Sequence, residues 1–220
     1  DTDIEHEQEE DGSQAVDGVS YQHAISKRKD TYELRLKYGI PAKKRVFFCP
    51  ARLLKLKGLD LFLKSAGKVK GISKACFLLA GEGPMKKELQ DIADKENLDV
   101  HFMGYCNQDT VIEFYALSDF FFLPSLQDCN PLSAIEAAFA GLPLCVSIYT
   151  GNSPELIQPY KNGVVFDILD TEEVQACIYF LLNASEEWVS NAGRESLAIA
   201  QNSFACINET KKFLAQLREG

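Results

Sequence analysis

The sequence predicts a doubly wound α/β fold, in which helices cover both faces of a parallel β-sheet. Short, continuous apolar runs of the kind found in strands buried on both faces alternate six times with segments of helical periodicity. The loops between them are short and are commonly bounded by Gly or Pro. Because a parallel connection needs a long crossover, usually a helix, this alternation favours a parallel sheet.

The predicted strands share aliphatic, aromatic and cysteine residues with few charges. They are expected at residues 45–50, 74–81, 100–104, 119–125, 144–148 and 164–166. The predicted helices combine one apolar face with Gly or Pro near their ends. They are expected at residues 26–38, 58–69, 84–96, 109–117, 131–140, 154–158, 171–183, 186–201 and 203–217.

The stretch that organises the prediction is PSLQDCNPLSAIEAAFAGLP, residues 124–143. We expect Asn130 to be the N-cap of a helix and Pro131 its first residue, where the missing N–H has no cost. Gly141, followed two residues later by a proline, ends that helix. A loop-to-helix junction is therefore predicted directly after the fourth strand.

Two acids stand eight residues apart across this junction. Glu136 lies inside a largely apolar helix, where a carboxylate is costly unless something hydrogen-bonds it. Asp128 lies in the loop at the carboxyl end of a strand, which is where open parallel sheets bind ligands. We interpret the pair as a ligand site. The alternative for such a pair is a Glu136 that faces water and an Asp128 that only caps the helix.

Charge and cysteine usage limit the function classes. The net charge is −9, but eight acids and no Lys or Arg fall in residues 1–20, so the other 200 residues sum to about −1. A nearly neutral folded part argues against a nucleic-acid surface. Residues 1–22 are expected to be a disordered acidic leader. The seven cysteines form no C-x-x-C pair, which predicts a reduced, cytoplasmic protein without a metal site.

No transmembrane segment is predicted. The longest run without charges, residues 137–154, is interrupted by Gly141 and Pro143, so it does not form a spanning helix. The first residue is Asp1 rather than Met, and we expect the chain to be a piece of a longer protein.

A second loop carries two cations toward the same edge of the sheet. Arg52 and Lys57 follow the first strand and precede a helix at Gly58. Two cations over a helix N-terminus suit a dianion such as a diphosphate. Taken alone, the loop is more simply interpreted as a solvated basic loop. An acid and two cations on one rim suit a ligand that is half sugar and half diphosphate, because the carboxylate would repel the phosphates and the cations would attract them.

Two further loops end strands at this edge. Gly81 and Gly83 flank Glu82 in a tight turn before Pro84, where glycines allow a close backbone approach or simply make a turn. The loop TGNSPE, residues 150–155, is expected to lead into a short helix that Ser153 caps.

These loops, in this order, resemble the donor-binding domain of retaining GT-B glycosyltransferases, the family that includes glycogen, starch and sucrose synthases. The resemblance runs from about residue 45 to the C-terminus. It rests on motifs that are specific in combination: ARLLKLKGLD for G-R-x4-K-G, GEGP for G-x-G-P, Asp128 to Glu136 for E-x7-E, TGNSPELI for G-G-x-P-E-L-I, and NGVVF for N-G-x-x-V.

The resemblance implies a Rossmann-like fold, the C-terminal half of a GT-B enzyme, with residues 23–220 binding a nucleotide sugar. Arg52 and Lys57 would hold the diphosphate and stabilise its charge as it leaves, Asp128 would bind sugar hydroxyls, and Glu136 would bind the ribose. Backbone groups would contact the ligand at two further places. At the sugar, the residues are Cys129, Asn130, Pro131 and Leu132. Near the phosphates and the base, they are Gly81, Gly83, Gly104 and Tyr105.

The implied donor is a UDP-, GDP- or ADP-sugar, with no other cofactor and no metal. Two departures bear on the sugar: Asp128 replaces the family's usual Glu, and Asn130-Pro131 replaces an aromatic-glycine pair. The acceptor-binding half, which would precede this one and take a carbohydrate or lipid acceptor, is not in the sequence, so we expect binding without appreciable transfer. Alternative functions are a non-catalytic nucleotide-sugar-binding module and a nucleotide-sugar epimerase of the same architecture.

Overall fold

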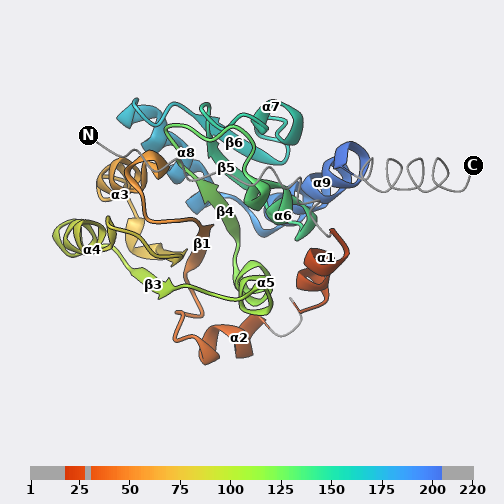
Figure 1. Ribbon diagram of the computed structural model, residues 1–220, viewed down its shortest axis with the longest axis horizontal. Helices are drawn as coiled ribbons and strands as arrows, with labels where there is room; N and C mark the ends of the chain where they lie inside the picture. The colour runs from red at the N-terminus through yellow and green to blue at the C-terminus, as the bar shows by residue number, and fades with distance from the viewer. Residues whose placement is uncertain (1–17, 28–30, 205–220) are drawn as a thin grey trace, which may run out of the picture.

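A single parallel sheet of six strands forms the centre of the protein, in the order β3-β2-β1-β4-β5-β6 (Figure 1). The computed structural model describes residues 18–27 and 31–204. The strands are β1 (Arg45–Pro50), β2 (Ala75–Ala80), β3 (Val100–Gly104), β4 (Phe120–Leu123), β5 (Leu144–Ser147) and β6 (Gly163–Phe166). Each lies within about a residue or two of its predicted position, and the predicted doubly wound α/β class is confirmed.

The chain reverses direction across the sheet between β1 and β4. From β1 it runs outward through β2 to β3, and it then returns to place β4 on the other side of β1. All the strand pairs are parallel, so the carboxyl ends of the strands meet at one edge. In sheets of this kind ligands bind where the strand order reverses, beside the carboxyl ends.

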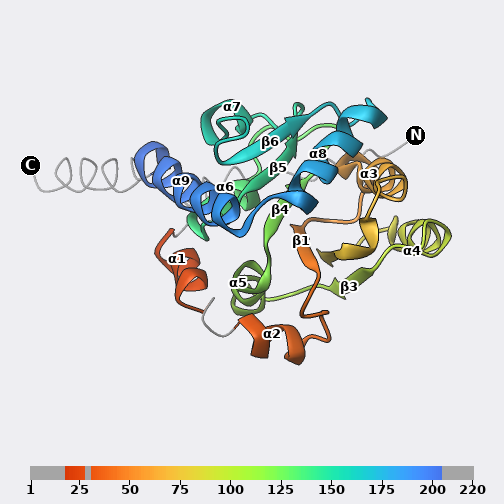
Figure 2. The same ribbon diagram turned by 180° about the vertical axis from the view of Figure 1, so that it is seen from behind.

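Helices cover both faces. The α-helices are α1 (Gly18–Lys27), α2 (Thr31–Lys37), α3 (Leu59–Ala66), α4 (Lys86–Lys95), α5 (Gln108–Leu117), α6 (Leu132–Phe139), α7 (Ser153–Leu156), α8 (Thr171–Asn183) and α9 (Glu186–Phe204). Two short 3-10 helices are η2 (Lys55–Lys57) and η3 (Ile72–Lys74). Helices α3, α4 and α8 lie on one side of the sheet, and α1, α5 and α6 lie on the other (Figure 1). Seen from behind, α9 runs beside α6 (Figure 2).

Aromatic side chains fill the core on both faces of β1. Phe47 contacts Phe77 and Phe122, and Phe62 of α3 stacks on Phe122 with ring centroids 4.7 Å apart. The next residue, Phe48, points to the opposite face, because side chains alternate along a strand. There its ring meets those of Phe114 and Tyr115 on α5. The continuous apolar run in the sequence therefore reflects a strand that is buried on both faces.

The predictions for the first and last helices need correction. The single helix expected at 26–38 is two helices, α1 and α2, and residues 28–30 between them lie outside the described residues. Helix α1 begins at Gly18, inside the range expected to be a leader, and its Tyr21 and Ala24 are buried in the core. Residues 1–17 and most of the helix expected at 203–217 lie outside the described part of the chain.

Two other helix starts differ from expectation. Helix α4 begins at Lys86 rather than at Pro84, which lies in the preceding turn. Ser153 is the first residue of α7, and Asn152 precedes it as the N-cap without a side-chain capping bond. In the described residues, no helix combines the length and apolar character that crossing a membrane requires.

Candidate functional site

Five loops at the carboxyl ends of the strands join into one continuous rim. Backbone hydrogen bonds join each pair of neighbouring loops, in the order of the strands in the sheet. The four bonds run from Gly81 N to Gly104 O (2.7 Å), Leu53 N to Glu82 O (2.9 Å), Leu126 N to Leu56 O (2.8 Å) and Gly151 N to Asp128 O (2.8 Å). The rim therefore holds the predicted loops in fixed positions relative to one another.

Gly58 allows the cationic loop to approach the fourth strand closely. Its φ is +63°, and a Cβ at this position would lie 2.1 Å from the backbone oxygen of Pro124. Such a contact is sterically impossible, so any side chain would push the loop away from β4. Glycine at this position therefore keeps Lys57 next to the loop that follows β4.

The glycines of the GEGP turn serve the protein's own packing. A Cβ on Gly81 would lie 2.1 Å from Ala51 O, and one on Gly83 would lie 2.4 Å from Leu53 O. Both glycines thus let the loop after β2 pack against the loop after β1. This close approach is made to the chain itself, which favours the turn interpretation. Their predicted contact with a ligand stays a prediction.

Lys57 and Asp128, 71 residues apart, meet in a direct ion pair. The Lys57 Nζ donates to Asp128 Oδ2 at 2.5 Å, and the two side chains are 23% and 15% exposed. Beneath them, burial raises the pKa of the Cys49 thiol to about 12, an effect that Asp128 adds to and Lys57 opposes. A cation and an acid that were assigned to two halves of one ligand therefore lie side by side at the end of β1.

Arg52 stands exposed on the same loop. Its backbone oxygen accepts from Leu54 N at 2.9 Å, and the residue that follows it, Leu53, is held by the loop after β2. Across residues 18–27 and 31–204, no hydrogen bond or ion pair involves the Arg52 guanidinium. Five N–H donors are therefore available to a ligand at the rim.

Glu136 lies on the second turn of α6, and tyrosine hydroxyls donate to both of its carboxylate oxygens. Tyr21 of α1 donates to Oε1 at 2.8 Å, and Tyr115 of α5 donates to Oε2 at 3.0 Å. Burial raises the pKa of Glu136 above its ordinary value, and the two tyrosine bonds oppose that rise. The carboxylate thus has hydrogen-bond donors within the protein, and its predicted contact with a ligand stays a prediction.

The prediction for the start of α6 was wrong. Helix α6 begins at Leu132, and its N-cap is Pro131 in an extended conformation, without a side-chain capping bond. Asn130 instead accepts a bond from Nδ2 of Asn152, which donates to Pro131 O as well, both at 3.1 Å. Because Pro131 is itself extended and the Asn130 side chain bonds to Asn152, the helix starts one residue later than predicted.

Three residues at the site carried no signal, or only a partial one, in the sequence. Asn152 is buried and holds the turn at 130–131, but in sequence it was only one residue of a polar loop. Tyr115 falls within the helix predicted at residues 109–117, to which no polar role was assigned, and Tyr21 falls within the expected leader at residues 1–22. Periodicity assigns a tyrosine to the core, and it does not indicate where the hydroxyl points.

The remaining predicted residues are spread along the rim. Cys129 and Asn130 are exposed and Leu132 is partly buried, beside the ion pair of Asp128. Tyr105 is 87% exposed and follows Gly104 at the end of β3. Tyr105 follows β3 and the other residues follow β4, and these strands are three spacings, about 14 Å, apart in the sheet. Among the described residues, the structure brings Lys57 and Asp128 into contact and leaves Tyr105 at the far end.

A cluster of possible metal ligands lies at the opposite, amino edge of the sheet. Cys76, Asp99 and His101 place three possible metal-ligand atoms within 4.8 Å of one another, but Asp99 is already paired with Lys44 at 2.9 Å and with His101 at 3.0 Å. The expected absence of a metal at the rim stays a prediction.

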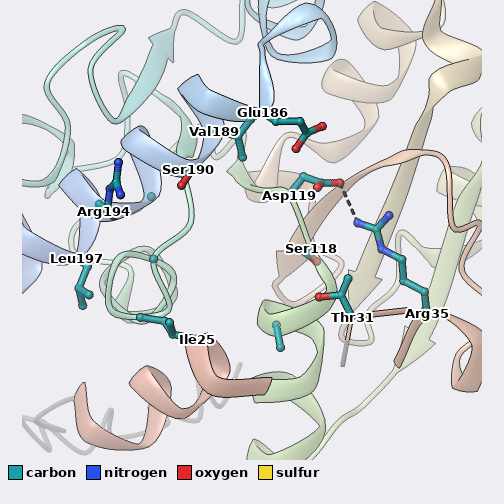
Figure 3. A pocket seen from close by; sticks show the side chains of 13 residues that line it. Ile25, Thr31, Arg35, Ser118, Asp119, Glu186, Val189, Ser190, Arg194 and Leu197 are labelled. Carbon is teal, nitrogen blue, oxygen red and sulfur yellow. Dashed lines mark hydrogen bonds and ion pairs between the residues drawn. The ribbon is translucent and has the colours of Figure 1, made fainter. Parts of the chain in front are cut away.

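A pocket of about 360 Å³ lies between α2, α9 and the start of β4 (Figure 3). Its charged residues include Arg35 and Asp119, which pair with each other at 2.9 Å. None of the predicted site residues lines it.

Comparison with known proteins identifies the family and confirms the fold. The family model described as "Glycosyl transferases group 1" matches residues 30–195. N-acetyl-alpha-D-glucosaminyl L-malate synthase from Bacillus anthracis is 26% identical over 169 residues, which are 77% of this chain and 44% of that protein. The chain spans less than half the length of the curated relatives it matches.

Solved structures share the same architecture. Anabaena Alr3699/HepE, in complex with UDP and glucose, has a TM-score of 0.74 at 20% identity and covers 86% of this chain and 52% of its own. The C-terminal domain of the group 1 glycosyl transferase LpcC from Francisella tularensis has a TM-score of 0.68 at 19% identity, covering 78% of this chain and 91% of its own. The structure thus has the fold of a GT-B C-terminal domain, and by its match over residues 30–195 the chain belongs to the group 1 glycosyl transferases.

Proposed function

We propose that this chain is the donor-binding part of a retaining glycosyltransferase that uses a nucleoside-diphosphate sugar. The observation that carries the proposal is the contact between Lys57 and Asp128 beside an exposed, unpaired Arg52, on a rim whose loops are hydrogen-bonded to one another. Within residues 18–27 and 31–204, no other group bonds to the Arg52 guanidinium. Opposite charges at this spacing suit a ligand with an anionic part and a neutral, hydroxyl-rich part.

The two cations would bind the diphosphate. Arg52 offers a planar fork of donors that matches phosphate oxygens, and Lys57 acts as a point charge. When the bond between the sugar and the diphosphate breaks, negative charge develops on the leaving oxygen. Cations already in place stabilise that charge without having to reorganise, which lowers the barrier.

Asp128 would bind the sugar. As a carboxylate it accepts hydrogen bonds from hydroxyls, and its bond with Lys57 holds it beside the phosphates. The backbone of Cys129 to Leu132, held by Asn152, would add contacts to the same sugar. Tyr105 and Gly104, at the end of β3, would meet the base at the other end of an extended ligand.

The names of similar proteins support a nucleotide-sugar donor but differ in the nucleotide. The Anabaena protein was solved with UDP and glucose, and a relative from Mycobacterium tuberculosis, 28% identical over 175 residues, is named as GDP-mannose-dependent. We therefore propose a UDP- or GDP-sugar donor, with an ADP-sugar as the further candidate. Transfer to a carbohydrate or lipid acceptor, in the cytoplasm, is proposed for the whole protein with an acceptor-binding half.

The test is a calorimetric titration of the chain with matched pairs, UDP with UDP-glucose and GDP with GDP-mannose. We expect dissociation constants between about a micromolar and a millimolar. Asp128→Ala should weaken binding of the nucleotide sugar more than that of the free diphosphate, whereas Asp128→Glu should retain the preference for the sugar. If no pair binds at any concentration tested, the donor-site assignment is wrong. Retention itself is read from the anomeric configuration of the product, by NMR on the whole protein.

A further inference from the structure

We propose that Tyr21 and Tyr115 are positioning residues that orient the carboxylate of Glu136 so that it receives the ribose hydroxyls of the donor. This inference rests on the proposed function and on the ribose-binding role that the resemblance implies for Glu136. It adds two residues that the motifs do not contain, one of them on a helix at the beginning of the described chain.

The tyrosine bonds leave acceptor positions free on the carboxylate. An ionised carboxylate has about four acceptor positions, two on each oxygen. Tyr21 uses one position on Oε1 and Tyr115 one on Oε2, so one position on each oxygen stays available. Two adjacent free acceptor positions match the two neighbouring hydroxyls of a ribose.

The two hydroxyls come from rings that are themselves held in place. Tyr115 is fully buried, and its ring meets that of Tyr21 edge to face at 5.7 Å and that of Phe48 at 5.0 Å. Tyr21 is 7% exposed. Because one donor comes from α1 and the other from α5, a rotation of the Glu136 side chain would break at least one bond.

The two tyrosines contribute unequally. The single hydroxyl proton of Tyr115 is shared between Glu136 Oε2 at 3.0 Å and Ser133 O at 3.1 Å. Tyr21 donates to Glu136 at the shorter distance of 2.8 Å. We therefore expect the larger effect from the loss of the Tyr21 hydroxyl.

The bonds also favour the charged form that a ribose needs. Burial raises the pKa of Glu136, and the hydroxyls of Tyr21 on α1 and Tyr115 on α5 lower it. Of the other elements packed against α6, namely α7, α9, β4 and β5, none contributes a described group that shifts this pKa. Without a tyrosine hydroxyl, the pKa of Glu136 should be higher still.

The test compares the affinity of the full chain for UDP with its affinity for 2′-deoxy-UDP. Where GDP binds more tightly than UDP, GDP and 2′-deoxy-GDP are used instead. We expect the wild-type chain to prefer the ribonucleotide by about 10- to 100-fold, the range for a hydrogen bond to a charged group. Tyr21→Phe should reduce that preference by about 3- to 10-fold and leave the affinity for the deoxynucleotide unchanged. Tyr115→Phe should act in the same direction with a smaller effect.

Tyr38→Phe is the matched control. It also removes a phenol hydroxyl that donates to a carboxylate, in this case Oε2 of Glu113 at 2.6 Å, but it does not touch Glu136. We expect its ribose preference to equal that of the wild type. Thermal unfolding of each variant identifies any that is not folded. If Tyr21→Phe does not fold, the ribose preference of Tyr115→Phe tests the inference in its place.

A pH series separates positioning from a merely structural role. The preference requires an ionised Glu136, so it is present above the pKa of this group and is lost as the pH falls through it. Because the missing hydroxyl raises that pKa, Tyr21→Phe should lose the preference at a higher pH than the wild type.

Three results would overturn the inference. In the first, Tyr21→Phe weakens the binding of both nucleotides equally. In the second, it tightens binding of the ribonucleotide, which would make Tyr21 a competitor of the ribose. In the third, the wild-type chain binds UDP or GDP without a ribose preference, which overturns this inference while the donor site stands. If no nucleotide binds at all, the proposed function falls together with it.

Discussion

The two edges of the same sheet carry similar charged residues in opposite states. At the amino edge, Arg35 is 7% exposed and its guanidinium donors are used within the protein. Its acceptors are Leu117 O, Ala42 O, Lys44 O and Asp119 Oδ2, at 2.9 to 3.1 Å. At the carboxyl edge, Arg52 is exposed and has no such acceptor in the described part of the chain. A structural arginine therefore differs from one available to a ligand in whether its N–H donors are already hydrogen-bonded within the protein.

The amino edge uses its charges to join segments that are distant in sequence. Arg35 on α2 reaches the end of α5 and the start of β4, and Asp119 also accepts from Val46 N at 2.7 Å. The pocket in Figure 3 lies beside this pair, and both members of the pair are already bonded within the protein. The rim has the half-buried ion pair of Lys57 with Asp128 and a second pair, Lys55 with the buried Asp60. Beside them, Arg52 is a cation without a partner among the residues described.

Arg35→Ala should have the largest effect on stability. Removing the buried partner of a hydrogen-bonded ion pair costs about 3–5 kcal/mol. Here three backbone oxygens would also lose their donor, and of its ion pairs Asp119 would keep only the longer contact with Arg45 at 3.7 Å. The free energy of unfolding from urea denaturation measures the loss. Lys37→Ala, which removes an exposed cation two residues away, should change it by less than about 1 kcal/mol. An Arg35→Ala variant that is as stable as the wild type but binds nucleotides poorly would invert the comparison of the two edges.

A comparison of Gly58→Ala with Gly71→Ala tests whether the cationic loop must lie close to the end of β4. Both glycines have positive φ, +63° and +84°, so both alanines carry backbone strain of about 1 kcal/mol. Only at Gly58 would the new Cβ meet another atom, Pro124 O at 2.1 Å. We expect Gly58→Ala to cost at least about 2 kcal/mol in unfolding free energy, from strain and overpacking together, and to weaken diphosphate binding. Equal losses in the two variants would show that the loop is not constrained by β4.

Arg52→Ala should leave the unfolding free energy within about 0.5 kcal/mol of the wild type, because the side chain is exposed. The binding free energy of UDP or GDP should become about 1.5–3 kcal/mol less favourable, the value of a hydrogen bond to a charged group. Isothermal calorimetry measures this change. Lys70→Ala removes a charge from an exposed turn at the amino edge and should leave affinity unchanged. An Arg52→Ala variant that binds as tightly as Lys70→Ala would exclude Arg52 from the diphosphate site.

The sequence by itself determined the fold class, the strands and the loops of the rim. These features depend on local patterns, because apolar runs, helical periodicity and glycine or proline punctuation act over a few residues. Since the carboxyl ends of parallel strands share an edge, the positions of Lys57 and Asp128 on one rim followed from the strand assignments.

Only the tertiary structure decided which side chains meet. Lys57 contacts Asp128 across 71 residues, Tyr21 contacts Glu136 across 115, and Asn152 holds Asn130 in place of the predicted cap. Each contact depends on how a crossover helix or loop sits on the sheet, and local periodicity does not contain that information. The motif residues were therefore visible in the sequence, whereas the hydrogen bonds that orient them depend on packing between distant segments.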